Sequence, residues 1–293
     1  MLTLERQLYE EEALTFLWHA VAAPLSAHVR FLYQWEGPVP HEREAIYPLP
    51  FMDLKFSFGD PLRVYEPGGD APAALCDGSW CIGIRNHRHI VEYPANARFV
   101  GVSFRPGGAL AFLRTPLSEL HNRIVPLADI WGPAVAALSE QLYEARSAGE
   151  RFALAEAILL DRLGDASSPS PVVGHVAEQI GRRHGAVRIG ALCSEVGISR
   201  KHLIDLFKRE VGCTPKELAR LHRFAHVLQS IDPAAPSDWT SLAYENNYFD
   251  QAHFSHDFAD YTGLNPSAYL QVLRGIPAQG FDHAAALGVS PAG

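Results

Sequence analysis

Two groups of basic and polar side chains in the C-terminal half have the types and spacing needed to read DNA. Within each group, outward positions alternate with apolar ones at the spacing of three and four residues that is typical of a helix. Side chains near the N-terminal half of a helix in the major groove contact base edges, and Lys or Arg neutralises phosphate. The predicted DNA-binding residues are Arg200, Lys201, Ile204, Asp205, Lys208 and Arg209 in the first group, and Gln251, Ala252, His253, Ser255 and His256 in the second.

These side chains lie in two copies of one pattern, at residues 189–215 and 239–266. Each copy reads as a short helix, a tight turn and a second helix, which is the helix-turn-helix arrangement. One such pattern is common among helical proteins, whereas two copies with matching ends are much more specific. The duplication predicts helix-turn-helix units over residues 189–210 and 239–262.

Turn and cap residues support these boundaries. The turns need a positive φ, which Gly197 adopts freely and Asn247 at a small cost. Ser199 and Asp250 are suited to begin the second helices. The segment Thr214-Pro-Lys-Glu217 has the form of a capping box with proline in the first turn, so it predicts the start of a helix that joins the two units.

The duplicated half resembles the DNA-binding region of the AraC/XylS family of bacterial transcription regulators. The likeness covers about residues 170–275, and YFDQAHFSHDF with the following TGLNPSAY is highly characteristic. FRPGGALAFL and PLSEL in the first half resemble the uncharacterised amino-terminal domain of one branch of these regulators. The resemblance implies that the units occupy successive major-groove segments. It implies base-reading positions at Lys201, Ile204, Asp205, Gln251, Ala252, Ser255 and His256.

The chain departs from the family pattern in three places. Asp205 stands where a family member often has Arg, and an acid there accepts from a cytosine amino group but is repelled by phosphate. Asn247 replaces the turn glycine of the second unit. The segment Ala259-Asp-Tyr261 replaces basic residues after Phe258.

Charge is distributed unevenly over the two units. Residues 181–223 hold ten bases and four acids, a net charge of +6, whereas residues 224–270 hold six acids and no Lys or Arg, a net charge of −6. Phosphate neutralisation supplies most non-specific DNA affinity. We therefore expect the first unit to dominate affinity. The second would tune specificity, through helix N-termini, polar groups and protonated His253 or His256, or would contact a protein.

The first half reads as rich in β-strands. Phe51–Phe58 alternates apolar and polar side chains, with Asp53, Lys55 and Ser57 on the polar face, which predicts a half-buried strand. Short strands separated by Gly, Pro and Asn favour a sandwich or a small barrel. Further strands are expected at residues 80–85, 90–93 and 99–104.

A helical hairpin is expected after the strands, over residues 133–146 and 150–163 with a break at Ala148-Gly149. Its apolar stripes either cover the sheet or form a dimer seam. Aromatic residues of the first half either pack in its core or line a pocket for a small molecule. They are Trp18, Phe31, Tyr33, Trp35, Phe56, Trp80 and Phe99.

Composition narrows the class of protein. The chain has 293 residues, a net charge of −8 and 47% hydrophobic residues, which fits a folded protein of two domains and not a disordered one. No apolar run is long enough to span a membrane, and the start lacks the pattern of a signal peptide. Four cysteines without a C-x-x-C pair argue against a disulfide framework or a zinc ribbon, so we expect a cytoplasmic protein.

Other candidate sites are weaker. His87, His89 and Glu92 faintly resemble the metal ligands of cupin barrels, although the following spacing does not fit. Arg105-Pro-Gly-Gly108 is suited either to a strand-to-helix turn or to anion binding. Cys76 and Cys81 are too few to complete a zinc site. No catalytic signature is present, so we expect no catalytic residue, no metal and no cofactor.

We therefore expect an α+β protein of two domains. A β-rich, barrel- or sandwich-like domain with a helical hairpin would span residues 1–165 and would sense an effector or dimerise. A linker at 166–171, an all-α DNA-binding domain at 172–275 and a flexible tail at 276–293 would follow. The predicted function is transcription regulation through double-stranded DNA, with RNA polymerase, a small-molecule effector and a homodimer as further partners and no membrane contact. A cupin-like metal-dependent enzyme and a protein-interaction module remain the alternatives.

Overall fold

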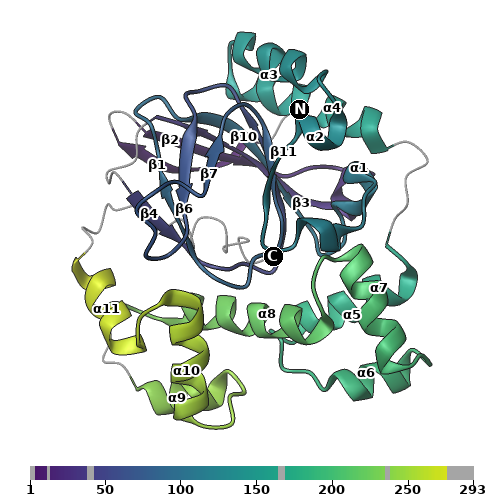
Figure 1. Ribbon diagram of the computed structural model, residues 1–293, viewed down its shortest axis with the longest axis vertical. Coiled ribbons are helices and arrows are strands. Elements are labelled where there is room, and N and C mark those ends of the chain that lie inside the picture. The colour runs from purple at the N-terminus through teal and green to yellow at the C-terminus, as the bar shows by residue number, and fades with distance from the viewer. Residues whose placement is uncertain (1–3, 12–13, 38–42, 164–168, 235–237, 276–293) are drawn as a thin grey trace.

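A computed structural model of the chain describes residues 4–11, 14–37, 43–163, 169–234 and 238–275. A β-rich domain with a cap of helices comes first in the chain, and an all-helical domain follows it (Figure 1). The predicted α+β class with two domains is confirmed. The predicted tail lies outside the described residues.

The larger sheet is antiparallel and has seven strands in the order β1-β2-β3-β10-β5-β8-β11. Its centre is the pairing of β10 with β3 on one side and β5 on the other. Gly101 of β10 lies directly over Tyr33, whose ring would be 2.1 Å from any Cβ at that position, so only glycine fits there. The strands are β1 (Leu4–Glu11), β2 (Leu14–His19), β3 (Val29–Glu36), β5 (Asp53–Ser57), β8 (Trp80–Ile82), β10 (Arg98–Phe104) and β11 (Ile124–Pro126).

The smaller sheet is also antiparallel and has the order β4-β9-β6-β7. It faces the larger sheet, and an aromatic core that includes Tyr33, Trp35, Tyr93 and Phe99 fills part of the space between them. The rings of Trp35 and Phe99 stack with centroids 6.1 Å apart. The strands are β4 (Arg43–Ile46), β6 (Leu62–Tyr65), β7 (Ala74–Cys76) and β9 (His89–Glu92).

The prediction that the strand around residue 55 is half-buried is wrong. All five residues of β5 are buried. Leu54 and Phe56 pack on the side of the helices, while Asp53 and Lys55 face the smaller sheet. The alternation of apolar and polar residues correctly shows which side chains share a face. The smaller sheet covers the polar face, so that face is buried as well.

Helices cover the outer face of the larger sheet. The predicted hairpin is present as α3 (Val135–Glu144) and α4 (Ala148–Leu163), with the break at residues 145–147 and not at Ala148-Gly149. Its apolar stripes contact β3, β5 and β10, which confirms that they cover the sheet. The shorter elements are η1 (Leu25–Ala27), α1 (Leu110–Leu113), η2 (Leu117–Leu120) and α2 (Ala128–Trp131).

The second half is helical throughout its described residues. Figure 1 shows the long helix α8 (Pro215–Ser230) running below the β-rich domain, with one group of helices at each end. Thr214 caps α8 in the predicted capping box with Glu217. The other helices are α5 (Pro171–Arg182), α6 (Ile189–Glu195), α7 (Arg200–Glu210), α9 (Trp239–Glu245), α10 (Gln251–Thr262) and α11 (Pro266–Gly275).

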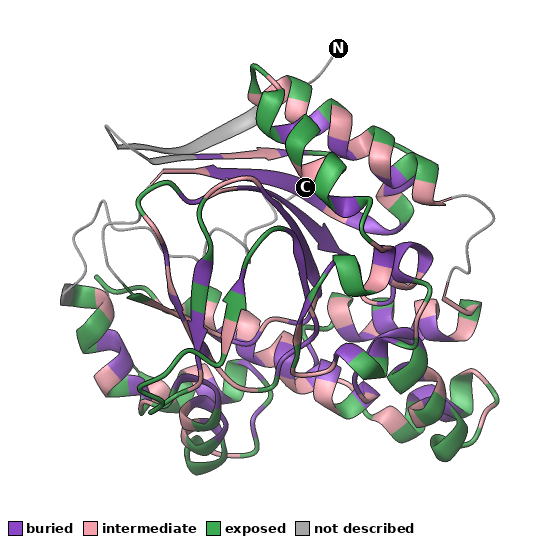
Figure 2. Cartoon of the chain, turned by 45° about the horizontal axis from the view of Figure 1, so that its top comes forward, coloured by how far each residue is buried: buried purple, intermediate pink, exposed green. Residues whose placement is uncertain are grey.

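Buried residues run from one half into the other without a break (Figure 2). The 3-10 helix η2 of the first half packs against α7. Gly212, just after α7, lies so close to Leu117 of η2 that an added Cβ would be 3.1 Å from its carbonyl oxygen. Among the described residues, no helix is long and apolar enough to cross a membrane.

Candidate nucleic-acid interface

The first unit consists of α5, α6 and α7. Ser199 caps α7 by accepting a hydrogen bond from the backbone N–H of His202, at 3.2 Å. Gly197 in the preceding turn has φ +71°, as the sequence predicts. Leu203 and Phe207 are fully buried and fix α7 against its neighbours, so the opposite face of the helix is turned outward.

The second unit consists of α9, α10 and α11 and repeats this construction. Asp250 caps α10 by accepting from the N–H of His253 at 2.7 Å, and Asn247 in the turn has φ +59°. Phe254 and Phe258 are the buried counterparts of Leu203 and Phe207. Each unit thus presents the N-terminal half of its second helix outside the core.

The predicted residues of α7 lie together on its outer face. Ile204 is half-buried and the others are exposed: Arg200, Lys201, Asp205, Lys208 and Arg209. Arg209 is held by an ion pair with Glu210, whereas the side chains of Lys201, Asp205 and Lys208 make no hydrogen bond or ion pair within the described part of the chain. This face offers cations and one carboxylate to a ligand.

The predicted residues of α10 form a polar face without Lys or Arg. Gln251, Ala252, His253 and His256 are exposed and Ser255 is half-buried. Gln251 accepts a hydrogen bond from Thr240 of α9 at 2.8 Å. His256 lies 3.4 Å from Asp260, one turn later.

One cation from α8 compensates the acidity of the second unit. Arg220 donates to both carboxylate oxygens of Asp257, at 2.9 and 3.4 Å, and lies 3.6 Å from Asp260. Burial alone would lower the pKa of Arg220, but the hydrogen bond and charge of Asp257 raise it above its usual value. Counting charges along the sequence assigned Arg220 to the first unit, and only the fold shows that it serves the second.

Two exposed aromatic side chains flank the turn of the second unit and were not singled out from the sequence. Tyr244 lies in the last turn of α9 with 63% of its surface exposed, and Phe249 precedes the cap of α10 with 85% exposed. Large apolar side chains with this much exposure mark interaction surfaces when they lie together. The sequence signal that could have found this surface is Phe249, an aromatic residue directly before the cap residue Asp250.

The halves are joined by hydrogen bonds as well as by apolar packing. Asn86 donates to Glu217 of α8 at 3.1 Å, and His121 lies 3.2 Å from the same carboxylate oxygen. Burial alone would raise the pKa of Glu217, but the hydrogen bonds from His121, Thr214 and Asn86 hold it below its usual range. Arg88 donates to the backbone oxygen of Thr262 at 2.7 Å. The segment between β8 and β9 thus contacts both α8 and the second unit.

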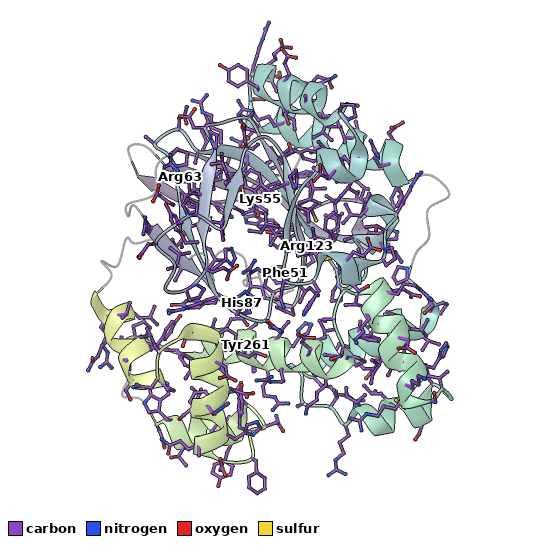
Figure 3. All side chains as sticks on the ribbon, viewed as in Figure 1. Phe51, Lys55, Arg63, His87, Arg123 and Tyr261 are labelled. Carbon is purple, nitrogen blue, oxygen red and sulfur yellow. The ribbon has the colours of Figure 1, made fainter. Side chains whose placement is uncertain are left out.

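Figure 3 shows His87 of the β-rich domain opposite Tyr261 of α10. Asn86 and Tyr261 line one groove between the domains together with Glu217 and Arg220. None of these inter-domain contacts is visible in the sequence, because the partners are far apart in the chain.

The structure does not bring together the residues of the weaker candidate sites. Glu92 bonds Arg43, Arg63 and Tyr65, while His87 contacts Glu66, so His87, His89 and Glu92 do not converge on one point. Arg105 donates to the backbone oxygen of Ser26 at 2.8 Å, at a strand-to-helix turn. Cys76 and Cys81 are buried free thiols. 

Among the described residues, the one group with donor atoms close enough for a metal is His256, Asp257 and Asp260. Its atoms lie within 4.8 Å of one another. Because Arg220 already contacts both carboxylates, we assign no metal to this group.

The two repeated units, each with a capped second helix whose outer face is exposed, define a helix-turn-helix DNA-binding protein. A family model of a helix-turn-helix domain, of the AraC type, matches residues 192–271, and a model of a domain of unknown function, DUF6597, matches residues 19–126. The chain is a DNA-binding transcription regulator in which a DUF6597 domain precedes the helix-turn-helix domain.

Solved structures give more distant likenesses. An apo variant of ToxT from Vibrio cholerae is 12% identical with a TM-score of 0.43, over 92% of this chain and all of that one. Wild-type ToxT from Vibrio cholerae bound to an unsaturated fatty acid is 14% identical with a TM-score of 0.41, over 94% of this chain and all of that one. The AraC-like activator CuxR is 16% identical with a TM-score of 0.32, over 80% and 87%. No curated protein matches the chain.

Proposed function

We propose that this regulator binds its DNA sites by placing α7 and α10 in successive segments of the major groove. The observation that carries the proposal is the outer face of α7, where Arg200, Lys201 and Lys208 are exposed while Leu203 and Phe207 anchor the opposite face. A rigid helix with this division presents side chains to base edges with little further ordering. The second unit repeats the geometry at the other end of α8.

The two units contribute differently to this function. Lys201 and Lys208 can neutralise phosphate, which supplies affinity on any DNA sequence. The face of α10 offers an amide, a hydroxyl and two imidazoles, so its contribution is hydrogen bonding to bases and the dipole of its N-terminus. Unit one therefore dominates affinity and unit two adjusts specificity.

Unit two is also suited to a protein partner. Tyr244 and Phe249 offer apolar area beside a surface whose acids include Glu245 and Asp260, a combination that a phosphate backbone disfavours. We propose RNA polymerase as that partner. A homodimer is a further proposal, supported by Tyr143 and Leu160, which are exposed on the solvent side of the α3–α4 hairpin.

The test is a DNA-binding titration of the full chain on its own upstream DNA, after footprinting has located the site. Lys201→Ala should weaken binding about tenfold on specific and random DNA alike and reduce the slope of log affinity against log salt by about 1. His256→Ala should weaken specific binding less and leave the salt slope unchanged. A larger loss from His256→Ala would overturn the ranking of the units.

A matched control removes a surface cation far from the proposed interface. Arg63 is exposed on β6 of the β-rich domain, where it pairs with Glu92, which keeps Arg43 as a second partner. Arg63→Ala should leave both affinity and salt slope unchanged. A loss equal to that of Lys201→Ala would mean that overall charge, and not the face of α7, determines binding.

A further inference from the structure

A hydrogen bond between two helices of the second unit restrains the first side chain of α10. Gln251 begins α10, and its side-chain oxygen accepts a hydrogen bond from the hydroxyl of Thr240 at 2.8 Å. Thr240 is the second residue of α9. Both residues are exposed, so the bond lies on the surface of the unit and not in its core. It therefore bears on the direction of the Gln251 side chain rather than on the packing of the helices.

The hydroxyl of Thr240 has a fixed place because the start of α9 is anchored. Asp238 caps α9 by accepting from the backbone N–H groups of Thr240 and Ser241, at 3.1 and 3.0 Å. The indole of Trp239 stacks on Phe254 of α10 with ring centroids 6.2 Å apart, and its N–H donates to a serine hydroxyl of α11 at 3.0 Å. The residues on both sides of Thr240 are thus held, so its hydroxyl is already in place when DNA arrives.

The first unit has no counterpart of this contact. Gly190 is the second residue of α6, as Thr240 is of α9, and a glycine has no side chain to offer. Arg200, the first residue of α7, is exposed and makes no hydrogen bond or ion pair within the described part of the chain. The contact between Thr240 and Gln251 therefore distinguishes the second unit from the first, and the duplication does not account for it.

The bond determines which atoms of the Gln251 amide are available to a base. A glutamine amide has one acceptor oxygen and a nitrogen with two N–H donors. The oxygen is held by Thr240, whereas the nitrogen makes no hydrogen bond among the described residues. In the major groove, guanine presents two acceptors, N7 and O6, while adenine presents one acceptor and one donor. An amide that offers its two donors therefore matches guanine.

We propose that Gln251 reads guanine in preference to adenine, and that Thr240 sets this preference. The inference rests on the proposed function, because it requires α10 in the major groove. An unrestrained glutamine reads adenine, since its oxygen accepts from the adenine amino group while its nitrogen donates to N7. That pairing competes with the hydroxyl of Thr240 for the amide oxygen, whereas guanine leaves the bond undisturbed. Thr240 is thus a positioning residue that acts through Gln251.

The place of Gln251 on α10 suits direct contact with a base. It is the first residue of the helix, and side chains near the N-terminus of a helix in the major groove reach base edges. The next residue, Ala252, is exposed and short, so it leaves room for this end of the helix to approach the DNA. A long side chain loses rotamer freedom when it binds, and the bond to Thr240 removes part of that freedom beforehand.

The first experiment locates the base that Gln251 contacts. The full chain is titrated with the footprinted site and with duplexes in which each base pair is replaced in turn. Gln251→Ala should lose discrimination at one position, where the wild-type chain should prefer guanine over adenine by about tenfold. Replacing that guanine with 7-deazaguanine, which lacks the N7 acceptor, should weaken wild-type binding about fivefold and leave binding of Gln251→Ala unchanged.

The second experiment tests the positioning role with Thr240→Val, because valine keeps the shape of threonine and lacks the hydroxyl. The ratio of guanine to adenine affinity should fall about tenfold, while the slope of log affinity against log salt stays unchanged. Thr240→Ser keeps a hydroxyl and should keep the preference for guanine. Ser241→Ala is the matched control, because it removes a neighbouring hydroxyl that donates to Asp238 and not to α10. It should also keep the preference.

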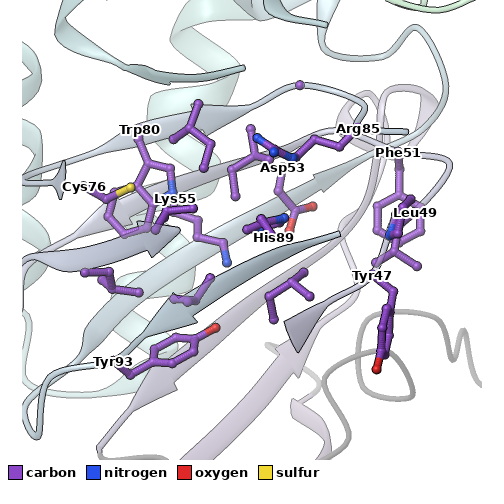
Figure 4. A pocket seen from close by; sticks show the side chains of 18 residues that line it. Tyr47, Leu49, Phe51, Asp53, Lys55, Cys76, Trp80, Arg85, His89 and Tyr93 are labelled. Atoms are coloured by element: carbon purple, nitrogen blue, oxygen red, sulfur yellow. The ribbon is translucent and has the colours of Figure 1, made fainter. Parts of the chain in front are cut away.

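A destabilising change in the other domain controls for indirect effects. Trp80 lines a cavity between the two sheets of the β-rich domain (Figure 4), outside both helix-turn-helix units. Of the seven aromatic residues expected either in the core or in a pocket, it is the one that lines this cavity. Trp80→Phe removes part of a buried side chain, so it should lower the unfolding temperature and leave the base preference unchanged. A shift in preference equal to that of Thr240→Val would assign the effect to lost stability and overturn the proposal.

The remaining outcomes separate this inference from the proposed function. A base other than guanine at the position of Gln251, no effect of 7-deazaguanine, an unchanged preference in Thr240→Val or a lost preference in Thr240→Ser would each overturn the inference, while base reading by α10 stands. If Gln251→Ala alters discrimination at no position, the proposed role of this residue in DNA reading fails, and the inference fails with it. The measurement with 7-deazaguanine uses the wild-type chain, so it decides the base even where Thr240→Val does not fold.

Discussion

Arg220 of α8 and Asp257 of α10 form a hydrogen-bonded ion pair, with Nη2 2.9 Å from Oδ1. The carboxylate is 7% exposed at the side chain, while the guanidinium is 36% exposed. The pair fastens the second unit to the helix that joins the units. Asp257 is thereby removed from the surface that faces a ligand, so the acidity of the second unit is lower than its sequence indicates.

Removing the cation of this pair should loosen the second unit. Arg220→Gln leaves the buried Asp257 with His253 at 3.8 Å as its remaining neighbour in the described structure. We expect a loss of about 1–3 kcal/mol in the local stability of α9–α11, below the value for a fully buried pair because Arg220 is partly exposed. Amide hydrogen exchange of these helices measures it.

A surface pair provides the control for this prediction. Arg182 and Glu178 form an exposed i,i+4 pair on α5, so Arg182→Gln should change stability by less than about 0.5 kcal/mol. Arg220→Gln combined with Asp257→Asn should recover part of the loss. Equal effects of the two single variants would show that the Arg220 pair does not fasten the unit.

The turn of the first unit should need glycine at position 197 because of the backbone conformation there, and not because space is short. Gly197 has φ +71°, and an added Cβ would meet no atom within 4 Å. Gly197→Ala should therefore cost about 1–2 kcal/mol through the left-handed conformation and nothing through steric contact. Chemical unfolding followed by hydrogen exchange of α6 and α7 gives the value.

Gly190 is a matched position in the same unit. It lies in α6 with equally open space around its Cβ position, and its φ is not in the left-handed region. Gly190→Ala should stabilise the unit by about 0.5–1 kcal/mol because alanine favours the helix. Effects of the same sign at both positions would contradict this account of the turn.

The sequence predicts the second half well because its signals are local. Ser199, Asp250 and Thr214 each bond a backbone N–H three residues later in the chain, and the left-handed turns fall at Gly197 and Asn247. Capping and positive φ depend on a few neighbouring residues, so a single sequence reveals them.

What the sequence could not give depends on partners far away in the chain. The polar face of β5 is covered by the second sheet, which makes Lys55 a buried group rather than a solvated one. The bond from Asn86 to Glu217 joins residues 131 positions apart. No local pattern distinguishes such residues from ordinary surface ones, since burial depends on which layers the chain packs together.

Lowering the pH should weaken the contact between the domains through His222. This side chain of α8 faces Arg30 of β3 and His184 after α5, and its buried Nε2 has no partner. Burial, aided by the charges of Arg30 and His184, lowers the pKa of His222 to about 4. The unfolded chain, with an ordinary histidine pKa near 6.5, binds more protons between these values, so stability falls as the pH drops from 6.5 towards 4.

Unfolding temperatures at pH 7 and pH 5 test this contribution. The wild-type chain should lose more stability on acidification than His222→Gln, by about 1–2 kcal/mol at pH 5. His202→Gln, which changes an exposed histidine of α7, should keep the wild-type response. If His222→Gln responds to pH as strongly as the wild type, another group controls the effect.

Asp205 is the one acidic side chain among the predicted DNA-binding residues of α7. It is exposed on α7 one turn after Lys201 and three residues before Lys208, in a row where the other charged groups are cations. A carboxylate there repels phosphate on every DNA sequence but accepts a hydrogen bond from the amino group of a cytosine. We expect it to read a cytosine. Asp205→Ala should therefore weaken binding to the specific site about tenfold and strengthen binding to random DNA a few-fold.

Titrations on the footprinted site and on random duplex DNA separate these two effects. Glu195→Gln is the control, because Glu195 is an exposed acid of α6 that pairs with His175 outside the reading face. It should alter both affinities little. If Asp205→Ala strengthens binding to both DNAs equally, the carboxylate contacts no base, and its effect in this position is electrostatic repulsion alone.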